Sequence, residues 1–177
     1  MIERLSLDQL HRVSVEEFRT LPKLPLIVCL DNIRSAMNVG SFFRTADAFL
    51  VERLILGGFT ATPPHKEITK TAIGATESVE WVHEEDIVLS LLTLKEMGYQ
   101  IAAVEQTTNS IPLQEVKIHG GDKLVLVFGN EVSGVQDDIL GIADFVIEVP
   151  QFGTKHSLNV AVCGGIVMWH CFQSMRF

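Results

Sequence analysis

The run Leu26-Ile27-Val28-Cys29-Leu30 indicates the fold class, because five consecutive apolar residues stand directly before a polar stretch. A short unbroken apolar run is typical of a strand buried on both faces of a sheet. Strands are also predicted at residues 53–56, 79–82, 100–104, 123–128 and 145–149. Helical periodicity occurs between them, at residues 39–49, 66–73, 84–97 and 157–172. This alternation predicts an α/β fold with a mostly parallel sheet flanked by helices.

The first 24 residues are predicted to form a short helical extension. Ser6-Leu7-Asp8-Gln9 and Ser14-Val15-Glu16-Glu17 both match the capping-box pattern that opens a helix. Pro22 and Pro25 then interrupt the pattern and indicate a linker. We therefore expect an extension over residues 1–24 and a single domain over residues 25–177, a length that suits one compact core.

Composition limits the cellular setting of the chain. The longest apolar run, residues 160–169, has ten residues, whereas a membrane-spanning helix needs about 20. No basic segment followed by an apolar stretch opens the chain, so no secretory signal is predicted. Cys29, Cys163 and Cys171 are scattered and lack the spacing of a disulfide framework or a metal site. We expect a cytoplasmic protein without a membrane segment and without a metal.

The charge distribution restricts how RNA or DNA can bind. The net charge is −8, which excludes a coat of non-specific nucleic acid. Residues 81–150 carry three basic and twelve acidic side chains, a net charge of −9. Residues 151–177 contain Lys155 and Arg176 and no acid. A local anion-binding site is therefore expected outside residues 81–150.

Three loops leave the carboxyl ends of predicted strands, where open α/β sheets bind ligands. The first contains Asn38-Val39-Gly40 and then Arg44, and Asn38 is expected to cap the following helix. The plain alternative is a capped helix with a surface arginine. The second loop is Phe128-Gly129-Asn130-Glu131-Val132-Ser133-Gly134, which lacks both the dinucleotide fingerprint and the P-loop pattern.

The third loop precedes the last predicted helix. Ser157 is a natural N-cap, so we expect the helix to begin there. Asn159 would then be a polar residue buried at the start of an apolar helix, where it needs a hydrogen-bond partner. The alternative is a capped core helix in which Asn159 bonds only a neighbouring loop.

Together the three loops resemble the three motifs of the SpoU/TrmH family, the RNA 2′-O-ribose methyltransferases of the SPOUT class. The resemblance covers about residues 25–173 and is carried by Asn38-Val39-Gly40 with Arg44, by Leu126-Val127-Phe128-Gly129-Asn130-Glu131 with Gly134, and by Val149-Pro150 with Gly153 and Ser157-Leu158-Asn159-Val160. It implies a C-terminal trefoil knot, S-adenosylmethionine as cofactor, an RNA substrate and a homodimer. It also implies a cofactor pocket built from Gln106, Thr107, Phe128, Gly129, Asn130, Val149 and Leu158.

The resemblance implies that the catalytic residues are Arg44, Asn38, Glu131, Ser157 and Asn159. A guanidinium with a pKa above about 12 is a poor proton acceptor, so we assign Arg44 to binding the ribose-phosphate and stabilising charge on the ribose oxygen. Glu131 and Asn38 are expected to hold Arg44. Ser157 and Asn159 are expected to position the ribose or the methionyl part of the cofactor, and the proton acceptor stays open.

The resemblance leaves three alternatives for the function. Transfer RNA is the expected substrate, with ribosomal RNA as the alternative and a helper protein as a further possibility. The expected phosphate contacts are Arg34, Arg44, Lys66, Lys70 and Lys155. A second hypothesis is a homodimer of the same fold that holds RNA or cofactor without catalysis. A third is an unrelated nucleotide-binding enzyme, which the missing glycine fingerprint after Leu30 disfavours.

Overall fold

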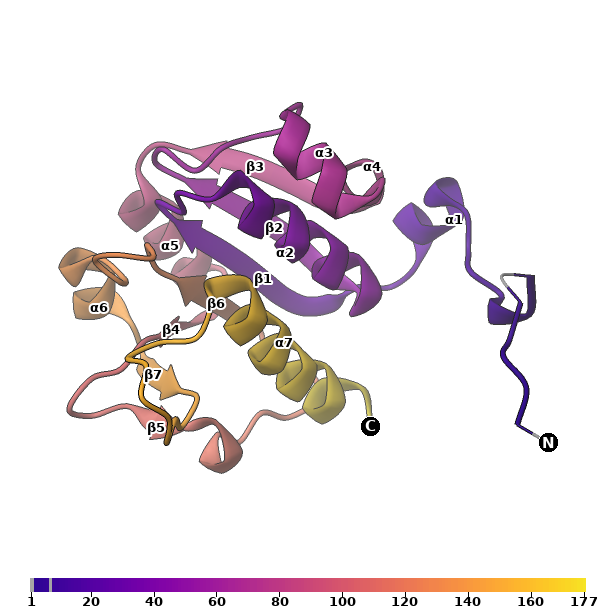
Figure 1. The fold of residues 1–177 in the computed structure, drawn as a ribbon. Coiled ribbons are helices and arrows are strands. Elements are labelled where there is room, and N and C mark those ends of the chain that lie inside the picture. Colours follow the sequence, from indigo (N-terminus) through magenta and orange to yellow (C-terminus); the bar gives the residue numbers. More distant parts are fainter. Residues whose placement is uncertain (1, 7) are drawn as a thin grey trace.

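The computed structural model describes residues 2–6 and 8–177 and contains one seven-stranded sheet (Figure 1). The strand order is β3-β2-β1-β6-β4-β7-β5, and every neighbouring pair is parallel. The strands are β1 (Leu24–Asp31), β2 (Val51–Gly57), β3 (Glu80–Glu84), β4 (Gln100–Val104), β5 (Ile111–Pro112), β6 (Leu124–Phe128) and β7 (Phe145–Glu148). The predicted α/β class with a mostly parallel sheet is confirmed.

Helices cover both faces of this sheet, as parallel sheets require. On one face lie α2 (Ala36–Ala48), α3 (Lys66–Ala72) and α7 (Val160–Arg176), with the short α4 (Ala75–Ser78) beside them. On the other face lie α5 (Ile87–Glu96) and α6 (Asp137–Ile142). Residues 26–30 of β1 are 0 % exposed, so this strand is buried on both faces. No helix in the described part of the chain is long and apolar enough to cross a membrane.

The N-terminal extension is less helical than predicted. It contains a 3-10 turn, η1 (Asp8–Leu10), and one short helix, α1 (Val15–Thr20). The first capping box forms through both hydrogen bonds, from Ser6 N to Gln9 Oε1 (2.8 Å) and from Gln9 N to Ser6 Oγ (3.4 Å), although Leu7 within it lies outside the described residues. Ser14 Oγ caps α1 by accepting from Glu17 N. Figure 1 shows the chain before α1 extending away from the sheet.

Several helix starts differ from the prediction. The helix expected over residues 84–97 begins at Ile87, because Glu84 still pairs with Gly57 as the last residue of β3 and Asp86 caps Leu89 N. The first turn of α2 is capped by Ser35, which accepts from Asn38 N, so the expectation that Asn38 is the cap is wrong.

The start of α7 differs as well. The prediction that Ser157 caps the last helix is wrong, because Asn159 Oδ1 accepts from Ala161 N and Val162 N. Asn159 is exposed in this chain and not buried as expected. The Asn159 side chain therefore begins α7 and also lies at the carboxyl edge of the sheet.

Gly164 and Gly165 are adjacent in α7, and replacing each with alanine is expected to have opposite effects on stability. A Cβ on Gly164 would lie 2.3 Å from the ring of Phe42, which is itself fully buried and 5.1 Å from the ring of Phe128. A Cβ on Gly165 meets nothing within 4 Å. Gly164→Ala should therefore lower the free energy of unfolding by about 1–3 kcal/mol. Gly165→Ala should raise it by up to about 1 kcal/mol, because alanine favours a helix. Urea unfolding measures both, and equal changes would contradict this packing.

Candidate active site

A cavity of about 460 Å³ opens at the carboxyl edge of the sheet, where β4, β6 and β7 end beside the start of α7. We call it the site cavity. Of the residues assigned to a cofactor, six line it and Thr107 does not. The main chain of Thr107 instead makes two hydrogen bonds with Ser110 Oγ. The six lining residues are Gln106, Phe128, Gly129, Asn130, Val149 and Leu158.

The site cavity combines an apolar wall with a polar rim. Its apolar side chains come from all three strand ends and from α7, and its polar side chains come from the loops. The apolar lining residues include Val104, Phe128, Ile147, Val149, Leu158 and Val160. The polar lining residues include Glu105, Gln106, Glu131, Gln151, Ser157 and Asn159. This volume and this mixture are typical of small-molecule sites.

Gly129 permits the tight loop that forms one side of the cavity. A Cβ there would lie 2.1 Å from the main-chain nitrogen of Val135, a distance that no side chain tolerates. The loop closes on itself through two hydrogen bonds between the main chains of Asn130 and Gly134. Glycine at position 129 therefore lets the loop fold back and present Glu131 and Val132 to the cavity.

The Glu131 carboxylate joins the second loop to the start of α2. It accepts from Arg34 N (2.9 Å), from Ser35 N (3.1 Å) and from the Asn38 amide (3.0 Å). Partial desolvation acts to raise the pKa of Glu131, but the hydrogen bonds from Arg34 N, Asn38 and Ser35 N outweigh it and hold that pKa below its ordinary value. The charged carboxylate also suits the positive end of the α2 dipole.

Asn38 extends this contact to the third loop. Its side-chain oxygen accepts from Asn159 Nδ2 at 3.1 Å, while its amide donates to Glu131. Three residues that we assigned to catalysis therefore form one chain of hydrogen bonds, which we call the Glu131–Asn38–Asn159 chain. Ser157 lines the cavity beside it. The three loops, distant in sequence, meet at one edge of the sheet.

Arg44 lies apart from this chain. It is exposed on α2, does not line the site cavity, and its guanidinium makes no hydrogen bond or ion pair within residues 2–6 and 8–177. The expectation that Glu131 and Asn38 hold Arg44 is wrong, because both oxygens of Glu131 already accept from the start of α2. The remaining expected phosphate contacts are also exposed: Lys66 and Lys70 share α3, whereas Arg34 and Lys155 lie in the loops before α2 and α7.

Asp31 supports the site, although no motif in the sequence singled it out. Its side chain is 0 % exposed and accepts from Gln136 N (2.9 Å), Gln136 Nε2 (2.6 Å) and Asn32 Nδ2 (2.8 Å). Asn130 Nδ2 also donates to the carbonyl of Asn32 at 2.7 Å. Through these hydrogen bonds Asp31 links the end of β1 to Gln136, just after the second loop. The available signal was an acid directly after an apolar strand.

We expect Asp31→Ala to lower the free energy of unfolding by about 2–5 kcal/mol, because it removes a buried carboxylate together with the three hydrogen bonds that it accepts. Chemical denaturation measures this loss. Asp137→Ala is the matched control, since Asp137 is exposed in the first turn of α6 and its removal should cost under about 0.5 kcal/mol. A loss for Asp31→Ala no larger than that of the control would refute this role.

Two further kinds of site, a metal centre and a reactive thiol, can be judged from the described side chains. No three His, Cys, Asp or Glu residues within the described ranges are arranged to hold a metal ion. Cys163 lines the site cavity, but burial and the nearby Glu105 raise the pKa of its thiol to about 11. At neutral pH this thiol is protonated and is a poor nucleophile.

Comparison with known proteins identifies the family. Residues 25–169 match the model of the SpoU rRNA Methylase family. The tRNA (guanosine(18)-2'-O)-methyltransferase of Aquifex aeolicus is 36% identical over 148 residues, which cover 81% of this chain and 67% of that protein. This chain spans 63–67% of the length of four curated relatives that it matches.

Two solved structures share the fold. The crystal structure of the A. aeolicus TrmH/SpoU tRNA modifying enzyme superimposes with a TM-score of 0.79 and 31% identity, covering 90% of this chain and 80% of that one. An AdoMet-bound rRNA methyltransferase from Sinorhizobium meliloti gives a TM-score of 0.78 at 24% identity, covering 88% of this chain and 59% of that one. The matched residues include all three loops of the candidate site, and the chain belongs to the SpoU rRNA methylase family.

Proposed function

We propose that this chain transfers a methyl group from S-adenosylmethionine to a ribose 2′-hydroxyl of RNA in the cytoplasm, and that its substrate is a tRNA. The observation that carries the proposal is the site cavity, which the second and third motif loops line and which the Glu131–Asn38–Asn159 chain joins to the first motif loop. Family membership supports methyl transfer to RNA. The 2′-hydroxyl is supported by the A. aeolicus relative, which is named as a 2'-O-methyltransferase.

The residues of the site cavity fit the proposed cofactor. Its apolar wall suits an adenine ring and excludes water, while the polar rim and the loop main chains offer hydrogen bonds to a ribose and an amino acid. Glu105 lines the cavity, and its carboxylate accepts from Val135 N at 3.1 Å. This hydrogen bond holds the side chain beside the end of the second loop. When bound, S-adenosylmethionine supplies a methyl group that is activated by its sulfonium.

The chain's own residues then position the RNA. Asn159 and Ser157 border the site cavity and orient the ribose, and Asn38 holds Asn159 in place. Arg44, which has no partner within residues 2–6 and 8–177, binds the ribose-phosphate and stabilises negative charge on the attacking oxygen. Glu131 is a poor proton acceptor, because three donors occupy its carboxylate and its pKa is low.

We also propose that the active form is a homodimer. Val162, Ile166 and Trp169 are 55%, 40% and 48% exposed on α7, and the Trp169 ring lies 5.6 Å from that of Phe49. An apolar surface of this kind marks an interface in many proteins. Sedimentation is expected to give twice the chain mass, and a monomer of 19.6 kDa at all concentrations would contradict the proposal.

The trefoil knot also remains a proposal from the resemblance. It is supported by the position of the segment before α7, which lies against the loop after β4: Gln106 Nε2 donates to the carbonyl of His156 at 2.9 Å.

A methylation assay tests the function and the choice of substrate. The purified chain is incubated with methyl-labelled S-adenosylmethionine and either total tRNA or ribosomal RNA, and the label is mapped after nuclease digestion. We expect a 2′-O-methylated nucleotide in tRNA. Label in ribosomal RNA alone would overturn the substrate, label on a base would overturn the ribose assignment, and no label in either RNA would contradict the proposed activity.

A further inference from the structure

A second hollow lies on the sheet face opposite α2 and α7. It is a groove of about 720 Å³ between α5 and α6, which we call the α5–α6 groove. Eight residues line it: Asp86, Val88, Leu89, Leu92, Asp137, Asp138, Gly141 and Ile142. None of them lines the site cavity, and none is assigned a role by the proposed function.

The floor of the groove is apolar and exposed. Leu89 is 62% exposed and Leu92 is 41% exposed, and the two lie one turn apart on the same side of α5. Val88 and Ile142 continue this surface down into the core beneath it. Covering leucine side chains removes apolar area from water and is favourable by about 25 cal/mol per Å².

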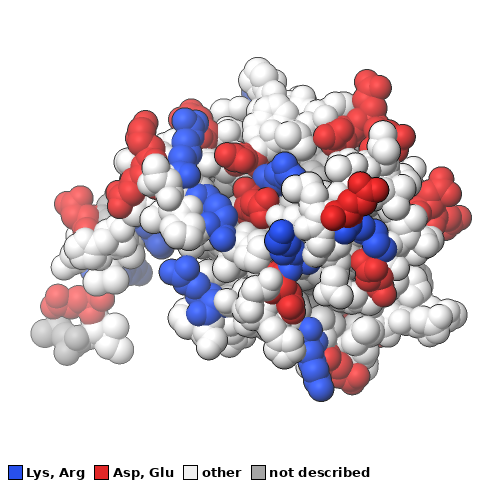
Figure 2. Space-filling model, turned by 180° about the vertical axis from the view of Figure 1, so that it is seen from behind, with Lys and Arg blue, Asp and Glu red and all other residues white. Residues whose placement is uncertain are grey.

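The rim of the groove is acidic. Asp86, Asp137 and Asp138 stand at the first turns of the two helices, and no Lys or Arg lines the groove. None of the three forms an ion pair with a residue that the structure describes. Figure 2 shows this side of the molecule, with acidic side chains along the edge away from the N-terminal segment. All three aspartates are exposed, and Asp86 Oδ1 also accepts a capping hydrogen bond from Leu89 N.

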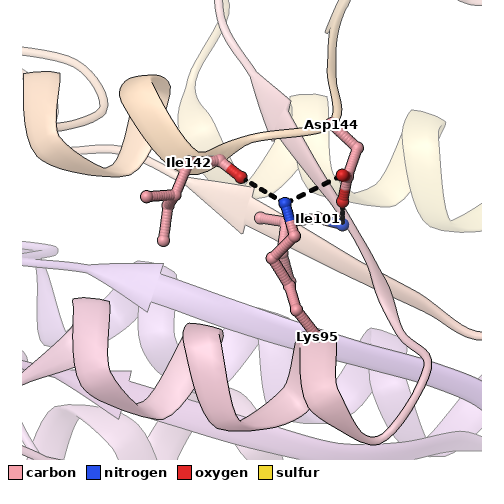
Figure 3. Close-up of polar contacts among 4 residues, drawn as sticks. All are labelled: Lys95, Ile101, Ile142 and Asp144. Carbon is pink, nitrogen blue, oxygen red and sulfur yellow. Dashed lines mark hydrogen bonds and ion pairs between the residues drawn. The ribbon is translucent and has the colours of Figure 1, made fainter.

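The basic residue of α5, Lys95, lies near the carboxyl end of that helix and is already hydrogen-bonded. Lys95 Nζ donates to the carbonyl of Ile142 and to Asp144 Oδ1, both at 2.8 Å (Figure 3). Asp144 Oδ2 also accepts from Ile101 N at 2.7 Å. These contacts join the carboxyl end of α5 to that of α6 and to β4. The two helices are therefore held together at one end, and the groove exists before any partner arrives.

We propose that the α5–α6 groove docks a basic amphipathic helix of a partner protein. The apolar side of that helix covers Leu89 and Leu92, and its Lys or Arg side chains face Asp86, Asp137 and Asp138. Charge complementarity selects this partner, because residues 81–150 carry a net charge of −9 and repel a polyanion such as RNA. A basic partner would also add positive charge for binding RNA, which this chain, with a net charge of −8, has in short supply.

The test uses two synthetic peptides of identical composition, made of Leu and Lys, as probes. One places its leucines at helical spacing to form an apolar stripe, and the other is scrambled so that no stripe forms. Nitrogen-15 chemical shifts of the full chain locate the binding site, and calorimetry gives the affinity at low and high salt. We expect the striped peptide to shift residues of α5 and α6 and to bind more weakly in high salt.

Variants separate the groove from non-specific attraction. Leu89→Ser together with Leu92→Ser should weaken the striped peptide at least about tenfold, and Asp137→Asn with Asp138→Asn about threefold or more. Met97→Ser is the matched control, because Met97 is 55% exposed just after α5 but does not line the groove. Circular dichroism verifies folding. Equal binding of both peptides, shifts confined to α7, or unchanged affinity in both double variants would overturn the proposal. This test needs no RNA or cofactor, so its outcome is independent of the proposed function.

Discussion

Replacing Arg44 with alanine is expected to lower the turnover number of methyl transfer by about 10²–10³-fold, the usual effect of removing a group that stabilises developing negative charge. The dissociation constant of S-adenosylmethionine should change by less than about threefold, because Arg44 does not line the site cavity. The free energy of unfolding should stay within about 0.5 kcal/mol, since Arg44 is exposed and has no partner in the described part of the chain. Steady-state kinetics, calorimetry and urea unfolding measure the three quantities.

Two further variants distinguish the position of the charge from the charge itself. Arg44→Lys keeps a cation but loses the planar fork, so it should recover only part of the turnover. Lys70→Ala removes an exposed cation from the neighbouring α3 and should weaken RNA binding without a large loss of turnover. A parallel loss of turnover and cofactor affinity in Arg44→Ala would contradict the assigned role.

Glu131→Gln is expected to lower turnover by about 10–100-fold, because the new amide cannot accept all three hydrogen bonds from Arg34 N, Ser35 N and Asn38. Cofactor affinity should fall by a smaller factor, about three- to tenfold, since the loop that carries Glu131 also lines the site cavity. Single-turnover kinetics and calorimetry separate these two losses.

A second acid of the same cavity serves as the control. Glu148 lines the site cavity, and within the described residues its side chain accepts one hydrogen bond, from Ser110 Oγ at 2.8 Å, so Glu148→Gln keeps this contact and should leave turnover within about threefold. Wild-type turnover in Glu131→Gln, or equal losses in the two variants, would refute the importance of the Glu131–Asn38–Asn159 chain.

The pKa of Glu131 predicts how this chain of hydrogen bonds responds to pH. Because the pKa is lower in the folded protein than in the unfolded chain, the stabilisation is fully present above the ordinary glutamate pKa, about 4.3. It is lost as the pH falls through the lowered value. The Glu131 carboxylate should therefore stay charged throughout neutral pH, and any titration of activity near pH 7 must come from another group.

The strands were predictable because burial on both faces leaves a local signature. Residues 26–30 are uniformly apolar and 0 % exposed, and β4 has the predicted bounds. The helix starts were less predictable, because several polar residues precede each helix and any of them is chemically able to cap it. Asp86 and Asn159 became the caps because of where the preceding segments end, which local sequence does not specify.

The site residues also fall into those that a local motif predicted and those that it did not. Glu131, Asn38 and Asn159 were selected by motif, and the structure brings them into one chain of hydrogen bonds. Asp31 was not selected, because its main partner, Gln136, lies 105 residues away and a single acid after a strand has no distinctive pattern. The partners of Arg44 were mistaken for a related reason: the donors that occupy Glu131 are main-chain groups, which every residue carries.

Calorimetry of S-adenosylmethionine with the full chain tests most directly whether the three loops form one site for a methyl donor. A single site formed by the three loops predicts one cofactor bound per chain with a dissociation constant of about 1–100 μM. Binding should be lost in Val149→Trp, because the larger side chain fills the site cavity. Absence of binding heat with the folded wild-type chain, or unchanged binding in Val149→Trp, would contradict it.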